Sequence, residues 1–174
     1  MGKARTPSPV KLVCGAIFRD EQVFSSALIT LRRAFGPTDF QSPRIPFTGT
    51  GYYSDEMGDG LVRVFVSFTK PVNPGRLADI KAATNRIEAR FSAQGRRRIN
   101  LDPGYVDCAK LVLATTKDFA HRTYLDKGIF AEVTLTFRGK GFRPYEWTYP
   151  DYRTDRYIQI FNHIRSLYAK QDAE

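Results

Sequence analysis

The sequence contains little of what usually builds disulfide scaffolds and metal centres, with two cysteines and two histidines in 174 residues. Cys14 and Cys108 both lie in apolar stretches, so we expect two buried thiols in a protein of a reducing compartment. The cysteines form no C-x-x-C pair and the histidines form no H-x-x-x-H pair. A disulfide framework and the common zinc sites are therefore excluded.

Long hydrophobic runs are absent as well. No apolar stretch approaches the roughly 18 residues that cross a bilayer, so we expect no membrane partner. Residues 1–9 carry positive charge but lead into no signal-type hydrophobic region with a cleavage site, and we expect this segment to be flexible. Together with the cysteine usage, these features predict a cytoplasmic protein.

The familiar nucleotide and hydrolase motifs are missing too. A P-loop needs Ser or Thr after its Gly-Lys pair, but Lys140 is followed by Gly141. No G-x-G-x-x-G lies between a strand and a helix, and no G-x-S-x-G nucleophile elbow occurs. The segment 116–118, Thr-Lys-Asp, is close to the guanine-reading pattern Asn/Thr-Lys-x-Asp, but its aspartate comes one residue too early. The common nucleotide hydrolases therefore have no support.

Positive charge, in contrast, is abundant. There are 27 Lys and Arg against 18 Asp and Glu, which gives a net charge of +9 and a pI near 9.7. This balance favours an anionic partner such as a nucleotide or RNA. A content of 42% hydrophobic and 26% charged residues is typical of one globular domain, which we expect to span residues 1–174.

The hydrophobic pattern predicts helices and strands in a mixed order. The first part reads as a buried strand, a helix capped by Asp20, an irregular edge strand, a polar loop, a strong strand, a long helix and two shorter strands. Their ranges are 11–18, 20–36, 39–47, 48–60, 61–68, 74–95, 96–101 and 111–116. Up to residue 101 the order is βαββαβ, which is the ferredoxin-like pattern, a sheet with two helices on one face.

The remaining sequence predicts a β-meander and a final helix. Turns at 126–128 and 139–141 separate three short strands at 122–125, 129–137 and 142–147. Thr154 is placed to cap the last helix. The expected fold class is α+β, with a ferredoxin-like core extended by a C-terminal β-meander and a final helix.

Side chains with catalytic potential concentrate between residues 100 and 154. His121 could exchange a proton near neutral pH, oriented by Asp102 or Asp118. Basic residues nearby could clamp a phosphate or carboxylate, and aromatic rings could stack on a flat ligand. The ligand-binding candidates are Asn100, Tyr105, Lys117, Arg122, Glu132, Trp147, Tyr149, Asp151 and Arg153.

The sequence names no cofactor, although carboxylates of this region could hold Mg²⁺ through water. Each candidate also has a structural interpretation. Residues 102–104, Asp-Pro-Gly, read as a turn, and Glu132 could belong to the solvated face of a sheet. His121 could be a hydrogen-bonded residue with no chemical role. The clustering of polar groups on loops at strand ends favours one shared site.

A basic patch forms a separate signal. On the long predicted helix, Arg86 and Arg90 lie opposite the apolar stripe, and Arg96, Arg97 and Arg98 follow directly. Five arginines so close together could contact a phosphate backbone. A solvated basic helix face is the structural alternative, and no recognised RNA-binding module appears.

Long segments of the chain resemble a known family. They are NLDPGY at 100–105, KLVLATTKD at 110–118, HR-x-YL at 121–125, AEVTL at 131–135, WTYPDYRT at 147–154, PVKL at 9–12, FGP at 35–37 and YY-x-x-EMG at 52–58. On these segments the chain resembles the prokaryotic family called domain of unknown function 4416, over nearly its whole length. The resemblance implies no established activity. Some members carry the label GTP-binding, and the missing P-loop gives no physical reason to extend that label.

Three functions remain open at this stage. The first is binding of a phosphate-bearing ligand, a nucleotide or RNA, at residues 100–154, with acid–base chemistry by His121. The second is a non-enzymatic RNA-binding module that uses the arginines at 86–98. The third is a protein-interaction or structural subunit whose basic surface meets an acidic partner.

Overall fold

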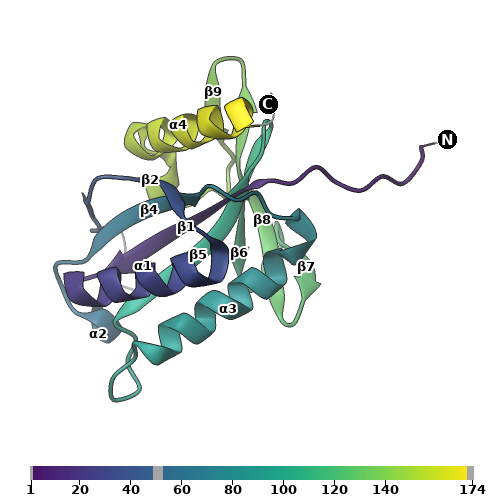
Figure 1. Cartoon of the computed structure of the whole chain (residues 1–174). Coiled ribbons are helices and arrows are strands. Elements are labelled where there is room, and N and C mark those ends of the chain that lie inside the picture. The colour runs from purple at the N-terminus through teal and green to yellow at the C-terminus, as the bar shows by residue number, and fades with distance from the viewer. Residues whose placement is uncertain (1, 49–52, 172–174) are drawn as a thin grey trace.

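The computed structural model describes residues 2–48 and 53–171. In this part of the chain, nine strands form one antiparallel sheet with helices on both faces (Figure 1). The strands are β1 (Lys11–Phe18), β2 (Thr38–Gln41), β3 (Ile45–Pro46), β4 (Val62–Phe68), β5 (Ile99–Val106), β6 (Lys110–Thr115), β7 (Thr123–Asp126), β8 (Ile129–Arg138) and β9 (Gly141–Pro144). The helices are α1 (Glu21–Phe35), α2 (Ser54–Met57), α3 (Leu77–Arg90) and α4 (Asp155–Gln171), with 3-10 turns η1 (Pro74–Arg76) and η2 (Pro150–Arg153). The predicted α+β class is confirmed.

The strands follow the order β2-β4-β1-β5-β6-β8-β7, with β3 also paired to β4 and β9 to β8. β1 lies between β4 and β5 near the middle of the sheet, and every one of its residues is therefore buried, as its largely apolar sequence predicts. β8 has ten residues, so β7 and β9 pair with successive parts of the same strand.

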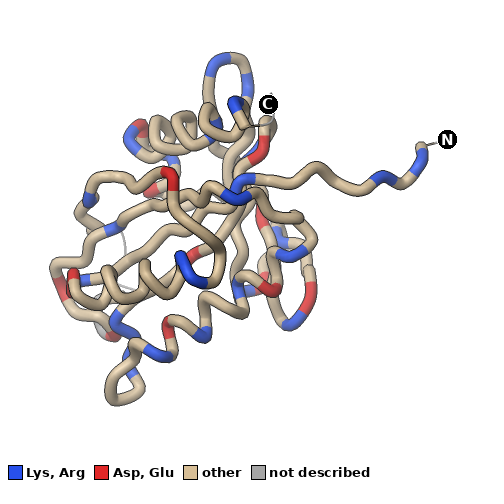
Figure 2. The backbone as a smooth tube through the Cα atoms, viewed as in Figure 1, with Lys and Arg blue, Asp and Glu red and all other residues tan. Residues whose placement is uncertain are grey.

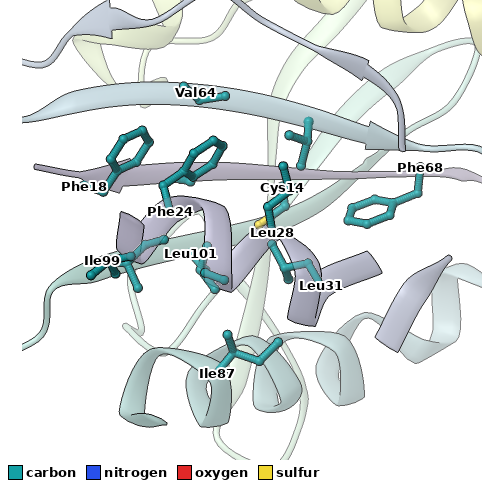
Figure 3. Close-up of a cluster of buried hydrophobic side chains, with 14 of the residues drawn as sticks. Cys14, Phe18, Phe24, Leu28, Leu31, Val64, Phe68, Ile87, Ile99 and Leu101 are labelled. Atoms are coloured by element: carbon teal, nitrogen blue, oxygen red, sulfur yellow. The ribbon is translucent and has the colours of Figure 1, made fainter. Parts of the chain in front are cut away.

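Separate hydrophobic clusters cover the two faces of the sheet. On one face, α1 and α3 pack over a cluster that includes Phe18, Phe24, Leu28, Ile87 and Leu101 (Figure 3). On the other face, α4 packs its buried side chains against those of β4, β6 and β8; this cluster includes Phe65, Leu111, Leu135, Phe161 and Ile164. Alternation of side chains along each strand supplies both faces.

The sheet opens between β5 and β6. β5 pairs with β1 along eight residues but with β6 only from Gly104 to Val106. Leu101 directs its backbone away from β1, where its N–H donates to Glu88 Oε1 (2.7 Å) and its carbonyl accepts from Lys81 Nζ (2.8 Å). Pro103, two residues further along β5, also directs its backbone away from β1, and it has no N–H to donate to β6. Two side chains of α3 thus replace the missing strand partner.

The structure corrects several predicted boundaries. Residues 102–104 form no turn but lie inside β5, paired with Cys14 and its neighbours on β1. The long helix ends at Arg90 rather than at Gly95, and β9 ends at Pro144 rather than at residue 147. The loop predicted at 48–60 contains the short helix α2, while its residues 49–52 lie outside the described part of the chain. Within residues 2–48 and 53–171, no helix has the length and apolar character of a membrane span.

The two cysteines differ, against the expectation that both are buried. Cys14 is buried in the sheet, and burial, reinforced by Asp102, raises the pKa of its thiol. Cys108 is exposed in the β5–β6 turn. We therefore expect a thiol-specific reagent to label one equivalent per native chain at Cys108, and the second only after unfolding. Mass spectrometry of labelled peptides checks this, and rapid native labelling of Cys14 would contradict its placement.

Candidate functional site

A cavity of about 620 Å³ lies where β5 and β6 are not paired. Its walls come from β4, α3, β5, β6, β8 and η2, so segments far apart in the sequence meet there. The lining is balanced in charge. The cationic groups belong to Arg63, Lys81, Arg97 and Lys117, and the acidic groups to Glu88, Asp102, Glu132 and Asp151.

Arg63 lies at the centre of this cavity wall. Its side chain is 4% exposed and reaches from β4 across β1, with Nη1 3.3 Å from Asp102 Oδ2 and Nη2 3.5 Å from Asp151 Oδ2. Gly15 of β1 makes this crossing feasible, since a Cβ there would come 2.8 Å from Arg63 Nη1. Aromatic rings of Phe47, Phe65 and Tyr152 lie 5.1–5.8 Å from the guanidinium carbon.

The guanidinium of Arg63 is incompletely bonded. Burial alone lowers its pKa, but the surrounding tyrosine and aspartate side chains outweigh that effect and raise it overall. Its Nε is buried and has no hydrogen-bond partner among the described residues. The two contacts to carboxylates are also longer than a normal charge-assisted bond. One buried N–H of a fixed cation, that of Nε, is thus left without a partner among the described residues.

Ionic contacts continue from Asp102 to side chains of α3 and of the segment that follows α3. Lys81 Nζ lies 3.7 Å from Asp102 Oδ1 and 4.0 Å from Glu88 Oε1. Arg97 Nη1 lies 3.5 Å from Glu88 Oε2, and its Nη2 donates to Glu56 Oε2 at 2.7 Å. Acidic and basic groups therefore alternate along one wall of the cavity, each held by its neighbours.

Two carboxyl groups of this wall hold their protons more firmly than usual. Burial raises the pKa of Asp151, although Arg63 opposes the shift. Burial likewise raises the pKa of Glu88, with Lys81 opposing it. Carboxyl groups whose pKa values are raised in a cleft are typical of functional sites.

Glu132 of β8 organises the opposite wall. It is buried, and its Oε2 accepts from Arg122 Nε (2.9 Å) and lies 3.1 Å from His121 Nε2. Arg122 also donates to the carbonyl of Lys117 (3.0 Å) and to the hydroxyl of Tyr149 (2.5 Å). These bonds tie the β6–β7 connection to β8 and to the segment before η2.

The sequence-predicted candidates separate into three groups. The structure brings Asn100, Asp102, Lys117, Glu132, Tyr149 and Asp151 together on the cavity lining. His121 and Arg122 adjoin it through Glu132, and the carboxylate that contacts His121 is Glu132 rather than Asp102 or Asp118. Tyr105, Asp118, Trp147 and Arg153 are not part of the lining.

The candidates outside the cavity have structural surroundings. Tyr105 packs with a small cluster beside the N-terminal end of α3. Trp147 stacks between the rings of Tyr145 (4.6 Å) and His121 (5.6 Å) and donates to the carbonyl of Val133. Arg153 donates to the carbonyls of Thr148 and Glu146, and so shapes the loop before α4. Asp118 is exposed. Among the described residues, no group of three His, Cys, Asp or Glu side chains could hold a metal ion.

Sequence reasoning missed Arg63, Lys81 and Glu88. Arg63 is the one charged residue of a strand that is apolar apart from Ser67, and that isolation was a usable signal. Lys81 and Glu88 lie seven residues apart on the same face of α3, which is beyond the i,i+4 spacing of helical ion pairs, so their spacing carried no signal. The predicted arginine patch is likewise divided, since Arg97 turns into the cavity wall and Arg98 donates to Asp20 (2.6 Å).

Figure 2 shows acidic and basic residues interspersed over the backbone, in keeping with these pairs. The model of a family described as Domain of unknown function (DUF4416) matches residues 8–168, which is nearly the whole chain. No curated protein and no solved structure matches the sequence. The cavity must therefore be interpreted from its own geometry.

Proposed function

Since the chain belongs to the family described as Domain of unknown function (DUF4416), whose description names no activity, we propose a function from the site: binding of a nucleotide in the cavity between β5 and β6. The observation that carries the proposal is the buried guanidinium of Arg63, which lines a partly open, charge-balanced cavity and whose Nε has no hydrogen-bond partner among the described residues. Buried polar groups without partners are costly, so such a cavity favours a polar ligand.

The interior suits a flat, polar and uncharged group such as a nucleobase. The carbonyl of Val112 points at β5, where a Cβ on Gly104 would approach it to 2.3 Å. Backbone direction repeats every two residues, so Ala114 turns its N–H and C=O toward the opening that β5 leaves. With Asn100 and Asp102 opposite, the cavity offers donors and acceptors to the edge of a base, and Tyr149 and Tyr152 offer rings for stacking.

The mouth of the cavity suits the phosphate. Lys117 is exposed at the end of β6, next to the hydroxyls of Thr115 and Thr116, and all three line the cavity. Arg122 holds the carbonyl of Lys117, which fixes the loop that carries this cation. A lysine ammonium is a common phosphate ligand. In this arrangement Asp151, with its raised pKa, is better placed than His121 to exchange a proton with the bound ligand.

We also propose the finer fold assignment and the location. The strand order β2-β4-β1-β5, with α1 and α3 on one face, supports a ferredoxin-like core within a single domain. Cysteines that form no disulfide support a cytoplasmic protein.

Calorimetric titration with AMP, GMP, CMP, UMP and GTP, each beside its nucleoside, tests the function. We expect at least one nucleotide to bind. Lys117→Gln should weaken the binding of that nucleotide about tenfold and leave the affinity for its nucleoside unchanged, because only the phosphate loses a charged partner. The matched control is Lys140→Gln, at the exposed β8–β9 turn, which should change neither of these two affinities. Absence of binding by all five nucleotides would reject the proposal and favour a polymeric or protein partner.

A further inference from the structure

A second depression, of about 510 Å³, lies on the surface between the end of β1 and the segment that follows α3. Four arginines and two acids line it: Arg19, Arg96, Arg97, Arg98, Asp20 and Glu56. Arg19 comes from the β1–α1 connection, which the sequence pattern did not associate with the basic patch. Arg86 and Arg90, which the pattern did include, are not part of this lining.

Both acids of the depression are already neutralised. Glu56 accepts from Arg97 through Nε (2.9 Å), Nη2 (2.7 Å) and the backbone N–H (3.1 Å), and this pairing lowers the pKa of Glu56. Asp20 caps α1 through Oδ1, which accepts from the N–H of Gln22, and its Oδ2 accepts from Arg98. Each carboxylate therefore has an arginine partner that offsets its charge.

The remaining two arginines leave a surplus of positive charge. Four guanidinium groups against two carboxylates leave two charges, which fall on Arg19 and Arg96. Both side chains are exposed, and neither makes an ion pair with another described side chain. Gly58 brings the chain close to Arg19, since a Cβ there would lie 3.1 Å from its Nη1.

We propose that this depression binds a phosphate group at Arg19 and Arg96. A phosphate monoester carries a charge of about −1.5 to −2 at pH 7, which matches the surplus. Guanidinium groups present paired donors that fit phosphate oxygens. The inference is independent of the nucleotide cavity, because neither Arg19 nor Arg96 lines that cavity. The phosphate can belong to a small phosphoester or to the 5′ end of an RNA.

The experiment compares a site variant, Arg19→Gln with Arg96→Gln, and a control, Lys140→Gln with Arg143→Gln, on the exposed β8–β9 hairpin. Neither pair removes an ion pair between described side chains, so both variants should fold. Each protein is titrated with inorganic phosphate, and with a short single-stranded RNA that carries or lacks a 5′ phosphate.

The site variant should bind inorganic phosphate about tenfold more weakly than the wild type, while the control stays within about twofold. If the 5′ phosphate strengthens RNA binding and the site variant removes that gain, the ligand is the RNA end. If the site variant loses affinity for inorganic phosphate but not for the 5′-phosphorylated RNA, the ligand is a small phosphoester. Equal affinities of wild type and site variant for every probe would overturn the proposal. Nucleotide binding in the cavity should persist in the site variant, so the two proposals fail separately.

Discussion

Replacing Arg63 by methionine should lower the free energy of unfolding by about 3 kcal/mol, because two half-buried carboxylates lose their shared cation. Asp102 and Asp151 are 27% and 23% exposed, which places the loss at the lower end of the range for broken buried pairs. For a chain of this size the melting temperature should fall by roughly 6–12 °C. Thermal and chemical denaturation followed by circular dichroism measure both quantities.

The loss in Arg63→Met should also depend on pH. Burial already raises the pKa of Asp151, and Arg63 is the group that opposes this shift. Without Arg63 the folded-state pKa of Asp151 rises further above its unfolded value. A carboxyl with a raised folded-state pKa destabilises the fold increasingly as pH rises through that range. The deficit should therefore be larger at pH 8 than at pH 5.

Arg143→Met provides the control for this experiment. Arg143 is exposed on β9, so its replacement should change stability by less than about 0.5 kcal/mol at either pH. A similar small change in Arg63→Met would mean that Arg63 does not hold the two aspartates together. The ionic description of the cavity wall would then be wrong.

Gly104→Ala should lower the free energy of unfolding by about 3 kcal/mol or more, because the new methyl group has no space between β5 and β6. Its Cβ would come 2.3 Å from the carbonyl oxygen of Val112 and 2.7 Å from Cδ2 of Leu113. A backbone oxygen inside a sheet cannot move alone, so the two strands must separate where they are joined by three residue pairs. Hydrogen exchange should accelerate at the amides of this short ladder.

Gly141→Ala is the matched control for the glycine experiment. A Cβ at Gly141 would approach only the side-chain amide of Asn162, at 3.1 Å, and a shift of a few tenths of an ångström relieves this while Oδ1 still accepts from the N–H of Phe142. We expect a loss below about 1 kcal/mol there. Comparable stability of the two variants, with unchanged exchange in the β5–β6 ladder, would contradict the close approach of the strands.

The sequence pattern predicted the strongly periodic elements well. The apolar run of β1 and the capped, amphipathic α1 carry local signals that need no tertiary information, and Asp20 caps α1 as expected. The Asp-Pro-Gly segment misled the prediction, because these residues are usually found in turns. In this chain Pro103 ends the pairing of β5 with β6, and Gly104 allows their close contact.

The candidate site could be predicted only in part. Asn100, Asp102, Glu132 and Asp151 lie near one another in the polar C-terminal half, and the pattern placed them in one group. Arg63 and Lys81 depend on partners from other elements, since a buried cation is recognisable only when the sheet order brings it to its carboxylates. The grouping of Arg19 with the segment after α3 around one depression likewise depends on the fold.

Backbone amide shifts of ¹⁵N-labelled protein during titration with AMP and GMP test the central claim most directly, because they locate the ligand. Nucleotide binding in the cavity predicts the largest changes at Asn100, Ala114 and Glu132, on three strands that line it. The ring current of a bound base should change the chemical shifts of these three amides much more than those of the β8–β9 hairpin. Saturable shifts confined to other residues, with these three amides unchanged, would contradict the assignment of the cavity.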